Sequence, residues 1–542
     1  MRLEAGEWQV RFQYSPASFT LGGLTSFMAG MIILFTFVVW GWRRYYREEG
    51  ELSNTRSIAK NSLAPMALNL FNRAIDFVYA AFYLRLLAPG DAGSFATAIT
   101  IASLYEIVSN WGLNTLVIRE VSKDRSQASR YLFNTTLLRF GTGLVAILPI
   151  ALYLGGRDLG GNPLALDTQL ALILLMLGMV FSGMGSGITG LFYAYEEAEI
   201  PASVTTVTTI LRVGFGVVVL LLGYGFVGLA AVSIVVNLVT LVILLAIGLY
   251  RFKLRGPWRL DLGLQRAMFG QSYPLMLNHL LATIFFFIDI PLLQQFKGDE
   301  AVGWYDSAYK YVKAFNIIPS FFTIALFPVI SRQISHSIDD ARRTFRMSVK
   351  LLLLVALPLA SLTTVIAPLL IGALGGAAFL PDGALALRLM VWSIPFGWVN
   401  SVTNYVLIAL GQERLQTRAF AAGVGFNLIA NIIFIPLYSY RAAAVTTILS
   451  EIVLLVIFNI YLLRKMPDIG WVRLLRRPIA VSAIMIFTMI ILTQVHWLAA
   501  AVGGLAVYGI GLFLFRIFGA EEKQILSNLL PEPVSARLRL VE

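Results

Sequence analysis

Long apolar runs separated by short polar stretches dominate the pattern along this chain. Runs of 18 or more residues recur over almost its whole length, and about 20 apolar residues suffice to cross a bilayer as a helix. A transmembrane β-barrel would instead show strands of about ten residues with alternating polarity. The pattern therefore predicts an all-α polytopic membrane protein with about fifteen transmembrane helices. We expect them at 20–42, 61–87, 92–113, 134–155, 168–193, 202–222, 224–250, 269–296, 303–331, 347–373, 384–410, 415–437, 441–464, 478–496 and 498–518.

The composition agrees with this class and excludes several kinds of site. The 542 residues are 58% hydrophobic and 13% charged. There is no cysteine, so neither a disulfide framework nor a thiolate metal site can form. Only three histidines are present and none has ligand spacing, so we expect no bound metal and no cofactor.

The net charge of +12 is unevenly distributed between the two sets of connections. Connections 43–60 and 251–268 hold five Lys or Arg residues each, whereas the opposite connections hold only Arg2, Arg11, Arg157, Lys297 and Arg441. By the positive-inside rule, this predicts a multi-pass protein of the cytoplasmic membrane with its N-terminus outside and its C-terminus in the cytoplasm. The basic residues then contact membrane lipids, and we expect no nucleic-acid partner. Segment 20–42 is too long for a signal peptide and predicts an uncleaved anchor.

An internal repeat divides the chain. PMALN at 65–69 matches PLMLN at 274–278, and GDAGSFATA at 90–98 matches GDEAVGWYDSA at 298–308. Each copy contains six helices, an even number, so both enter the membrane from the same side as parallel repeats around a central site. We therefore expect an anchor and basic linker (1–60), an N-lobe (61–260), a C-lobe (269–465), two further helices (466–518) and a cytoplasmic tail (519–542).

Two polar stripes interrupt the apolar pattern at related places in the two copies. Asn69, Arg73 and Asp76 share one face of their helix, and Asp306, Lys310 and Lys313 have the same spacing. A charge inside a membrane costs about 2.5–3.5 kcal/mol, so such residues usually face a polar interior. Two facing stripes would line one central cavity that suits a phosphate or diphosphate.

The charged residues within the apolar runs could also have roles other than lining a binding cavity. Arg73–Asp76 and Asp306–Lys310 could be ion pairs that only neutralise charge within the bundle. Glu106 and Asp289 could bind a coupling proton or cation, or could each pair with a basic residue on a neighbouring helix. Further polar candidates within the apolar runs are Arg139, Arg212, His279 and Arg388.

Sequence motifs typical of soluble enzymes are either missing from this chain or lie in segments where they cannot form the usual site. GSGITG at 185–190 fits a dinucleotide-binding pattern, but it lies inside an apolar helix without a preceding strand, which favours close helix packing. No P-loop, H-E-x-x-H or G-x-S-x-G pattern is present, and the outer loops are short. The sequence therefore favours a carrier over an enzyme.

Three stretches resemble polysaccharide exporters of the multidrug/oligosaccharidyl-lipid/polysaccharide (MOP) superfamily. They are RLLAPGDAGSFATAI (85–99), NWGLNTLVIRE (110–120) and NLIANIIFIPLYSYRAAAVTTILSE (427–451), and the resemblance covers roughly 55–470. The chain departs from the family where Ser439, Tyr440 and Arg441 replace a glycine-containing turn.

The resemblance implies a flippase that carries polyprenyl-diphosphate-linked oligosaccharide across the membrane by alternating access, with polymerase or glycosyltransferase machinery as candidate partners. It implies that basic residues of helices 1 and 8, here Arg73, Lys310 and Lys313, bind the diphosphate. It also implies that the two last helices hold the lipid tail. Competing hypotheses are a cation-coupled multidrug antiporter of the same superfamily and a membrane scaffold of a polysaccharide synthesis complex.

Overall fold

The computed structural model describes residues 22, 54–252, 258–515 and 517. The predicted anchor helix at 20–42, apart from Gly22, and the predicted tail lie outside the described residues. The division of the chain into lobes at 61–260 and 269–465 stays a prediction.

The described residues form helices and no strands, in agreement with the predicted all-α class. Every helix predicted between 61 and 518 has a helical counterpart. The first copy of the repeat contains α2 (Asn54–Leu86), α3 (Pro89–Asn110), α4 (Leu113–Lys123), η1 (Arg125–Gln127), α5 (Ala128–Leu159), α6 (Leu166–Ala194), α7 (Glu199–Leu221) and α8 (Gly225–Phe252). The rest contains α9 (Leu262–Phe287), α10 (Asp289–Lys297), α11 (Asp299–Phe315), α12 (Ile317–His336), α13 (Ile338–Gly375), η2 (Ala377–Phe379), α14 (Asp382–Met390), α15 (Ser393–Ala409), α16 (Glu413–Tyr438), α17 (Tyr440–Lys465), α18 (Trp471–Thr493) and α19 (Trp497–Leu514).

Within the described residues, twelve helical spans are long and apolar enough to cross a membrane, and the bent pair α9–α10 makes thirteen. Helix α2 is not among them although it has 33 residues, since Asn69, Asn72, Arg73 and Asp76 interrupt its apolar pattern. Its polarity is the feature that led us to expect a cavity beside it.

Two predicted single helices are broken. The predicted helix 269–296 bends by 42° between α9 and α10, and the predicted helix 303–331 is interrupted at Asn316. The chain turns between α3 and α4 at Gly112, whose φ is +70°. A Cβ there would also lie 2.9 Å from the Cβ of Leu275, so both the backbone and the packing require glycine. Apolar periodicity alone does not show such breaks.

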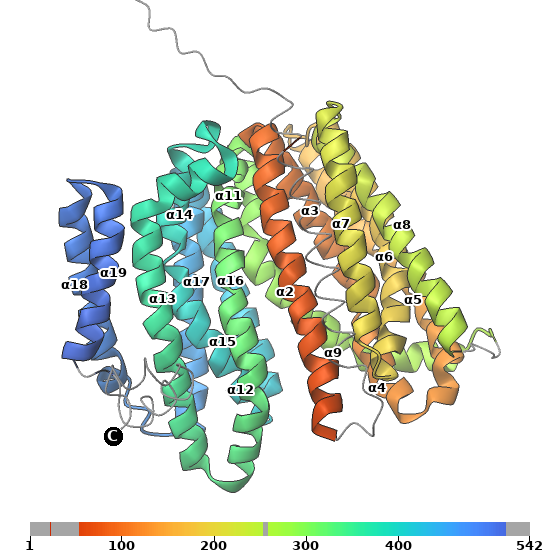
Figure 1. The fold of residues 1–542 in the computed structure, drawn as a ribbon. Helices are drawn as coiled ribbons and strands as arrows, with labels where there is room; N and C mark the ends of the chain where they lie inside the picture. Colours follow the sequence, from red (N-terminus) through yellow and green to blue (C-terminus); the bar gives the residue numbers. More distant parts are fainter. Residues whose placement is uncertain (1–21, 23–53, 253–257, 516, 518–542) are drawn as a thin grey trace, which may run out of the picture. The chain divides into compact units, whose positions relative to one another are not determined.

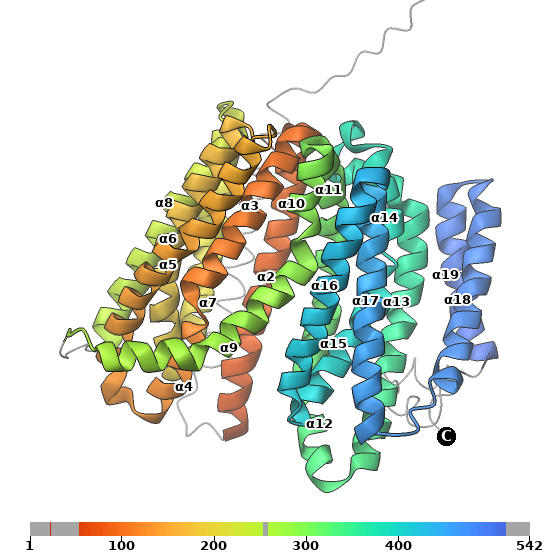
Figure 2. The ribbon, with the colours of Figure 1, turned by 180° about the vertical axis from the view of Figure 1, so that it is seen from behind.

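The helices pack in two sets (Figures 1 and 2). In the first copy, α3 packs on α5 and α6, and α8 packs on α6 and α7. In the second, α15 packs on α12, α13 and α17, while α14 packs on α11 and α13. The pair α18–α19 lies against α13. The two sets meet where α3 crosses α11, and α9 packs on α3 and α4.

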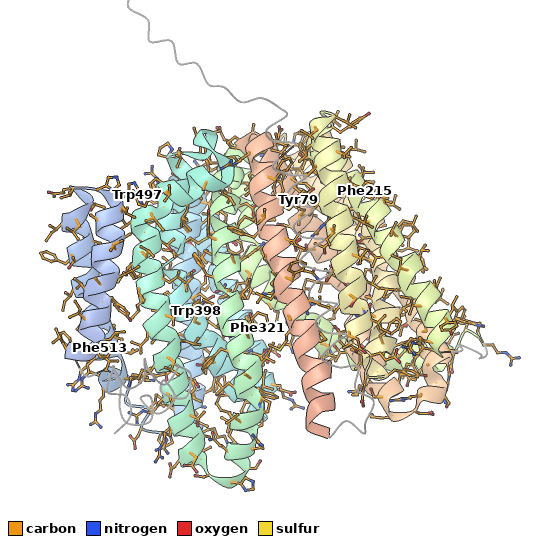
Figure 3. All side chains as sticks on the ribbon, in the orientation of Figure 1. Tyr79, Phe215, Phe321, Trp398, Trp497 and Phe513 are labelled. Atoms are coloured by element: carbon orange, nitrogen blue, oxygen red, sulfur yellow. The ribbon has the colours of Figure 1, made fainter. Side chains whose placement is uncertain are left out.

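Large apolar side chains cover the outer surface of these helices. Leu144, Leu148 and Leu152 of α5 are 61–76% exposed, and Phe513 of α19 is 53% exposed. Trp398, by contrast, is fully buried inside the second set (Figure 3), where its indole N–H donates to Asn316 Oδ1 at 3.0 Å. An exterior of this kind matches a protein surrounded by lipid.

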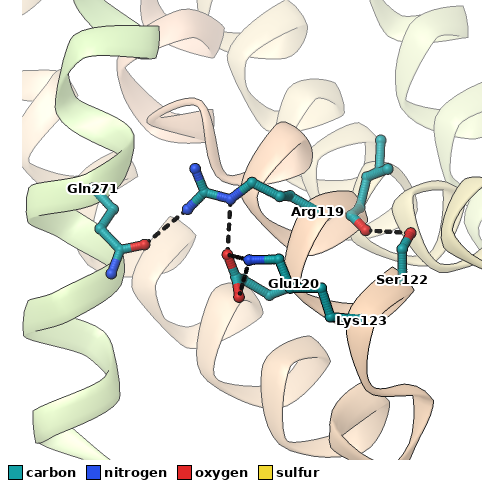
Figure 4. A network of polar contacts seen from close by, with 6 residues as sticks. Arg119, Glu120, Ser122, Lys123 and Gln271 are labelled. Atoms are coloured by element: carbon teal, nitrogen blue, oxygen red, sulfur yellow. Dashed lines mark hydrogen bonds and ion pairs between the residues drawn. The ribbon is translucent and has the colours of Figure 1, made fainter.

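Polar contacts join α4 to α9 on the predicted cytoplasmic side (Figure 4). Arg119 donates to Gln271 Oε1 at 2.9 Å and to Glu120 Oε1 at 2.7 Å, while Lys123 Nζ lies 3.1 Å from the same carboxylate. The connection between α3 and α5 thus contains a short helix, α4, that binds the start of the second repeat.

Ser439, where the resemblance led us to expect a glycine-containing turn, has an unusual backbone conformation. Ser439 ends α16 with φ +57° and ψ −143°, a backbone conformation that only glycine adopts without strain. The serine therefore makes this turn at a cost in backbone energy.

Candidate functional site

A cavity of about 700 Å³ lies among helices of both repeats. It is lined by Arg73, Asp76, Phe77, Tyr79, Ala80, Tyr83, Phe95, Ile99, Leu175, Met179, Arg212, Leu229, Ser233, Phe286, Phe287, Tyr309, Lys310, Lys313, Ala314, Asn316 and Ile317. Helix α2 supplies one wall and α11 another, because both turn a polar face inward at helical spacing. Two members of each stripe, Arg73 with Asp76 and Lys310 with Lys313, therefore line the same space.

Two carboxylates near the cavity, Asp76 and Asp306, are already paired. Asp76 forms an ion pair with Arg212 of α7 rather than with Arg73 on its own helix. Asp306, which lies behind the cavity wall, binds Lys310 at 2.7 Å. Asp306 and Lys310 therefore form the ion pair within one helix that was considered from the sequence, whereas Arg73 and Asp76 do not pair with each other.

Arg73 and Lys313 are the cationic residues of the lining without such a partner. Within the described part of the chain, no carboxylate oxygen lies within 4.0 Å of either side chain. Lys313 Nζ lies over two aromatic rings instead, 4.4 Å from the centroid of Phe287 and 5.0 Å from that of Tyr309. Such contacts stabilise a cation while leaving its charge uncompensated. Each repeat therefore contributes one basic group that an anion could bind.

Asn69, the third member of the first stripe, is exposed and does not line the cavity. Arg388 is also absent from the lining, and its Nε donates to the carbonyl of Thr364 at 3.1 Å.

Asp289 lies at the start of α10, directly after the bend that follows α9. It is 2% exposed, and its Oδ2 accepts hydrogen bonds from the hydroxyl of Tyr305 and, at 3.3 Å, from that of Thr447. Its Oδ1 has no hydrogen-bond partner among the described residues. Lys313 is close enough to interact with it electrostatically, so Asp289 adjoins the cavity without lining it.

Glu106, Arg139 and His279 form a separate group. Glu106 of α3 lies within electrostatic range of His279 and Arg139, but among the described residues it forms no ion pair within 4.0 Å, so both expected alternatives for Glu106 stay predictions. Arg139 is 5% exposed and donates to the carbonyl of Gly183 at 2.8 Å and to Asn114 Oδ1 at 2.5 Å. It lines a second pocket of about 140 Å³. Gly187 makes room for its guanidinium, so the GSGITG stretch serves helix packing.

Sequence reasoning missed a buried carboxylate. Glu451 of α17 is 6% exposed, and its Oε2 accepts a hydrogen bond from the amide of Asn400 at 2.7 Å. The sequence did contain a signal for this buried carboxylate, because Glu451 ends the stretch 427–451 and directly precedes an apolar run. The aromatic part of the cavity wall was also missed, because aromatic residues in an apolar helix do not reveal which way they face.

Comparisons with known proteins agree with this architecture. The family model described as "Polysaccharide biosynthesis protein" matches residues 58–334, and the MatE model matches residues 274–433. A probable low-salt glycan biosynthesis flippase of Haloferax volcanii is 23% identical over 76% of this chain and 86% of its own length. An uncharacterized membrane protein of Methanocaldococcus jannaschii is 25% identical over 49% of this chain, which spans only 54% of that protein.

Solved structures share the fold. A lipid II flippase in an inward closed conformation matches with a TM-score of 0.67 at 14% identity, covering 84% of this chain and 99% of its own. An inward-facing multidrug resistance transporter of the MOP superfamily matches with a TM-score of 0.60 at 14% identity, covering 73% of this chain and 95% of its own. At this identity the likeness concerns the fold.

Proposed function

The chain belongs to the polysaccharide biosynthesis protein family of the MOP superfamily, and from this premise we propose that it is a lipid-linked oligosaccharide flippase. It would carry a polyprenyl-diphosphate-linked oligosaccharide across the cytoplasmic membrane for surface polysaccharide synthesis. Alternating access around the central cavity would move the headgroup, and the polyprenyl chain would stay in lipid.

The observation that carries this proposal is the presence of two basic groups without carboxylate partners in one cavity. Arg73 comes from the first repeat and Lys313 from the second. A diphosphate carries adjacent negative charges, for which a guanidinium fork and an ammonium group are suitable donors. Arg212 and Lys310 already bind Asp76 and Asp306, so their charge is largely compensated.

The aromatic lining supports a sugar headgroup. Phe77, Tyr79, Phe95 and Phe286 border the same space as the basic groups. Aromatic faces pack well against the C–H faces of pyranose rings, and a tyrosine hydroxyl adds a hydrogen-bonding group. A cavity of about 700 Å³ has the size of a small-molecule binding site, so it would enclose only part of a long glycan.

Asp289 is the carboxylate best suited to couple transport to an ion. It is buried, one oxygen lacks a hydrogen-bond partner among the described residues, and it interacts with Lys313. Binding of a proton or cation there would change the field at a residue that faces the cavity.

Charge reversal tests the site. Arg73→Glu and Lys313→Glu should each abolish transport of a polyprenyl-diphosphate disaccharide into proteoliposomes at normal protein levels. Arg414→Glu provides a matched control, since Arg414 is exposed and does not line the cavity. Full transport by either cavity variant would contradict the assignment.

The same vesicles discriminate between the competing functions. The match to the MatE model favours a drug antiporter as the second candidate. That function predicts efflux of organic cations and no movement of the lipid-linked sugar. A scaffold predicts neither activity.

A further inference from the structure

Helices α3 and α11 approach each other unusually closely near their first turns, which lie at the predicted outer side of the membrane. A Cβ on Gly93 would overlap the carbonyl oxygen of Asp299, and a Cβ on Gly303 would overlap that of Pro89. The obstructing atoms are backbone atoms, so no side-chain rotation could relieve the overlap. This crossing therefore requires glycine at both positions.

The contact is reciprocal and follows the internal repeat. Gly93 and Gly303 are separated by 210 positions, and so are Pro89 and Asp299. Both glycines belong to the matched segments 90–98 and 298–308. Each repeat thus presents its glycine to the same backbone position of the other repeat.

Further polar contacts join the two repeats at the same predicted side. Arg157, at the end of α5, donates to Gln294 Oε1 of α10, and Asn162 Nδ2 donates to the carbonyl of Gln295 at 2.9 Å. Arg85, at the end of α2, donates to the carbonyl of Ala373 of α13 at 2.6 Å. The glycine crossing is therefore reinforced on both sides.

The cavity begins next to this crossing. Phe95, two residues after Gly93, contributes to the cavity wall. Beyond Asn316, α11 continues as α12, which packs on α13 and α15 of its own repeat. The repeats thus meet through α3 and α11 at the predicted outer end.

We propose that the Gly93–Gly303 crossing is the outer gate of the cavity. While α3 and α11 are in backbone contact the cavity is closed to the outside, and separation of these two helices opens it. The inference deepens the proposed alternating-access function and rests on it, but closure of a gate can be measured without any substrate. The opposing hypothesis is that the crossing is a permanent contact of the fold.

Cysteine accessibility provides the test, because the chain contains no cysteine of its own. A reporter is introduced as Ser233→Cys in the cavity wall, and intact cells are treated with a membrane-impermeant maleimide. We expect Gly93→Ala and Gly303→Ala to raise the labelling rate about tenfold each, equivalent to a shift of about 1.4 kcal/mol away from the closed state.

Gly90→Ala is the matched control. Gly90 lies in the first turn of the same helix with nothing within 4 Å of an added Cβ, so labelling should remain at the rate of the reporter alone. Unchanged labelling in correctly folded Gly93→Ala and Gly303→Ala proteins would overturn the proposal.

A cross-linking experiment decides the question if the alanine variants fold poorly. Asn162→Cys combined with Gln295→Cys should form a disulfide on oxidation, stop labelling of the reporter cysteine and stop transport until a reductant is added. If the cross-linked protein transports at the full rate, the crossing is permanent and the gate is refuted. If the reductant restores reporter labelling but no variant ever transports the sugar lipid, the gate stands and the proposed substrate fails.

Discussion

Lys313 and Lys310 lie one helical turn apart on α11, yet the structure predicts opposite consequences for their removal. Lys313 contacts aromatic rings and no carboxylate within 4.0 Å in the described part of the chain. Lys310 is paired with Asp306, whose side chain is 6% exposed. Replacing each lysine by methionine keeps the apolar stem and removes the charge.

The magnitude for Lys313 follows from its electrostatic interaction with an anionic ligand. Two unit charges 4 Å apart interact by about 4 kcal/mol at an effective dielectric constant of about 20. Desolvation reduces this, and hydrogen bonds to charged groups contribute about 1.5–3 kcal/mol. Lys313→Met should therefore lower the transport efficiency by about 10- to 100-fold, while its thermal stability stays close to that of the original protein.

Lys310→Met should act mainly on stability. It leaves the Asp306 carboxylate buried without its partner, and breaking such a pair costs about 3–5 kcal/mol. The double variant Lys310→Met/Asp306→Asn removes both charges and should recover most of the lost stability.

The assays are thermal unfolding in detergent and initial rates of sugar-lipid transport in proteoliposomes, normalised to protein content. A Lys313→Met protein that transports normally would refute the assignment of an anion-binding role. A Lys310→Met protein as stable as the original would refute the assignment of the ion pair.

Three further predictions concern other parts of the chain. Asp289→Asn should preserve the fold but abolish the response of transport to an imposed proton or sodium gradient, and a retained response would exclude Asp289 as the coupling site. Ser439→Gly should stabilise the protein by about 1 kcal/mol, measured by thermal unfolding, because it relieves backbone strain. Arg130 of α5 and the backbone N–H of Leu264 each donate a hydrogen bond to the carboxylate of Asp261, the N-cap of α9, and these bonds lower the pKa of Asp261. The stabilisation by Asp261 is therefore present at neutral pH and lost as the pH falls through that lowered pKa, so the deficit of Asp261→Ala in unfolding temperature should shrink under acid.

The sequence predicted the helices and the polar stripes because both depend on periodicity within one segment. Long apolar runs identify spans, and charges at i, i+3 and i+4 positions identify a face. The sequence did not predict the ion-pair partner of Asp76. Arg73 was the nearest candidate in sequence, whereas the structure pairs Asp76 with Arg212 of α7. Partner choice between distant helices depends on tertiary packing, which periodicity does not encode.

The same limit accounts for the broken helices. The interruption of the predicted helix 303–331 at Asn316 and the bend between α9 and α10 do not follow from apolar periodicity, so the pattern did not mark them. The internal repeat, by contrast, related segments that lie far apart in the sequence and contact each other in the structure. It matched the segments that contain Gly93 and Gly303, each of which contacts the backbone of the other repeat in the structure.

The reciprocal glycine contact has the form of an isologous interface, in which position i of one subunit touches position j of its partner and position j touches i. In a two-fold dimer of a single repeat, one glycine codon would provide both contacts. In this chain the two contacts are encoded separately at Gly93 and Gly303, so each can be lost independently. With both repeats in one polypeptide, mutation can disturb this crossing at two positions instead of one.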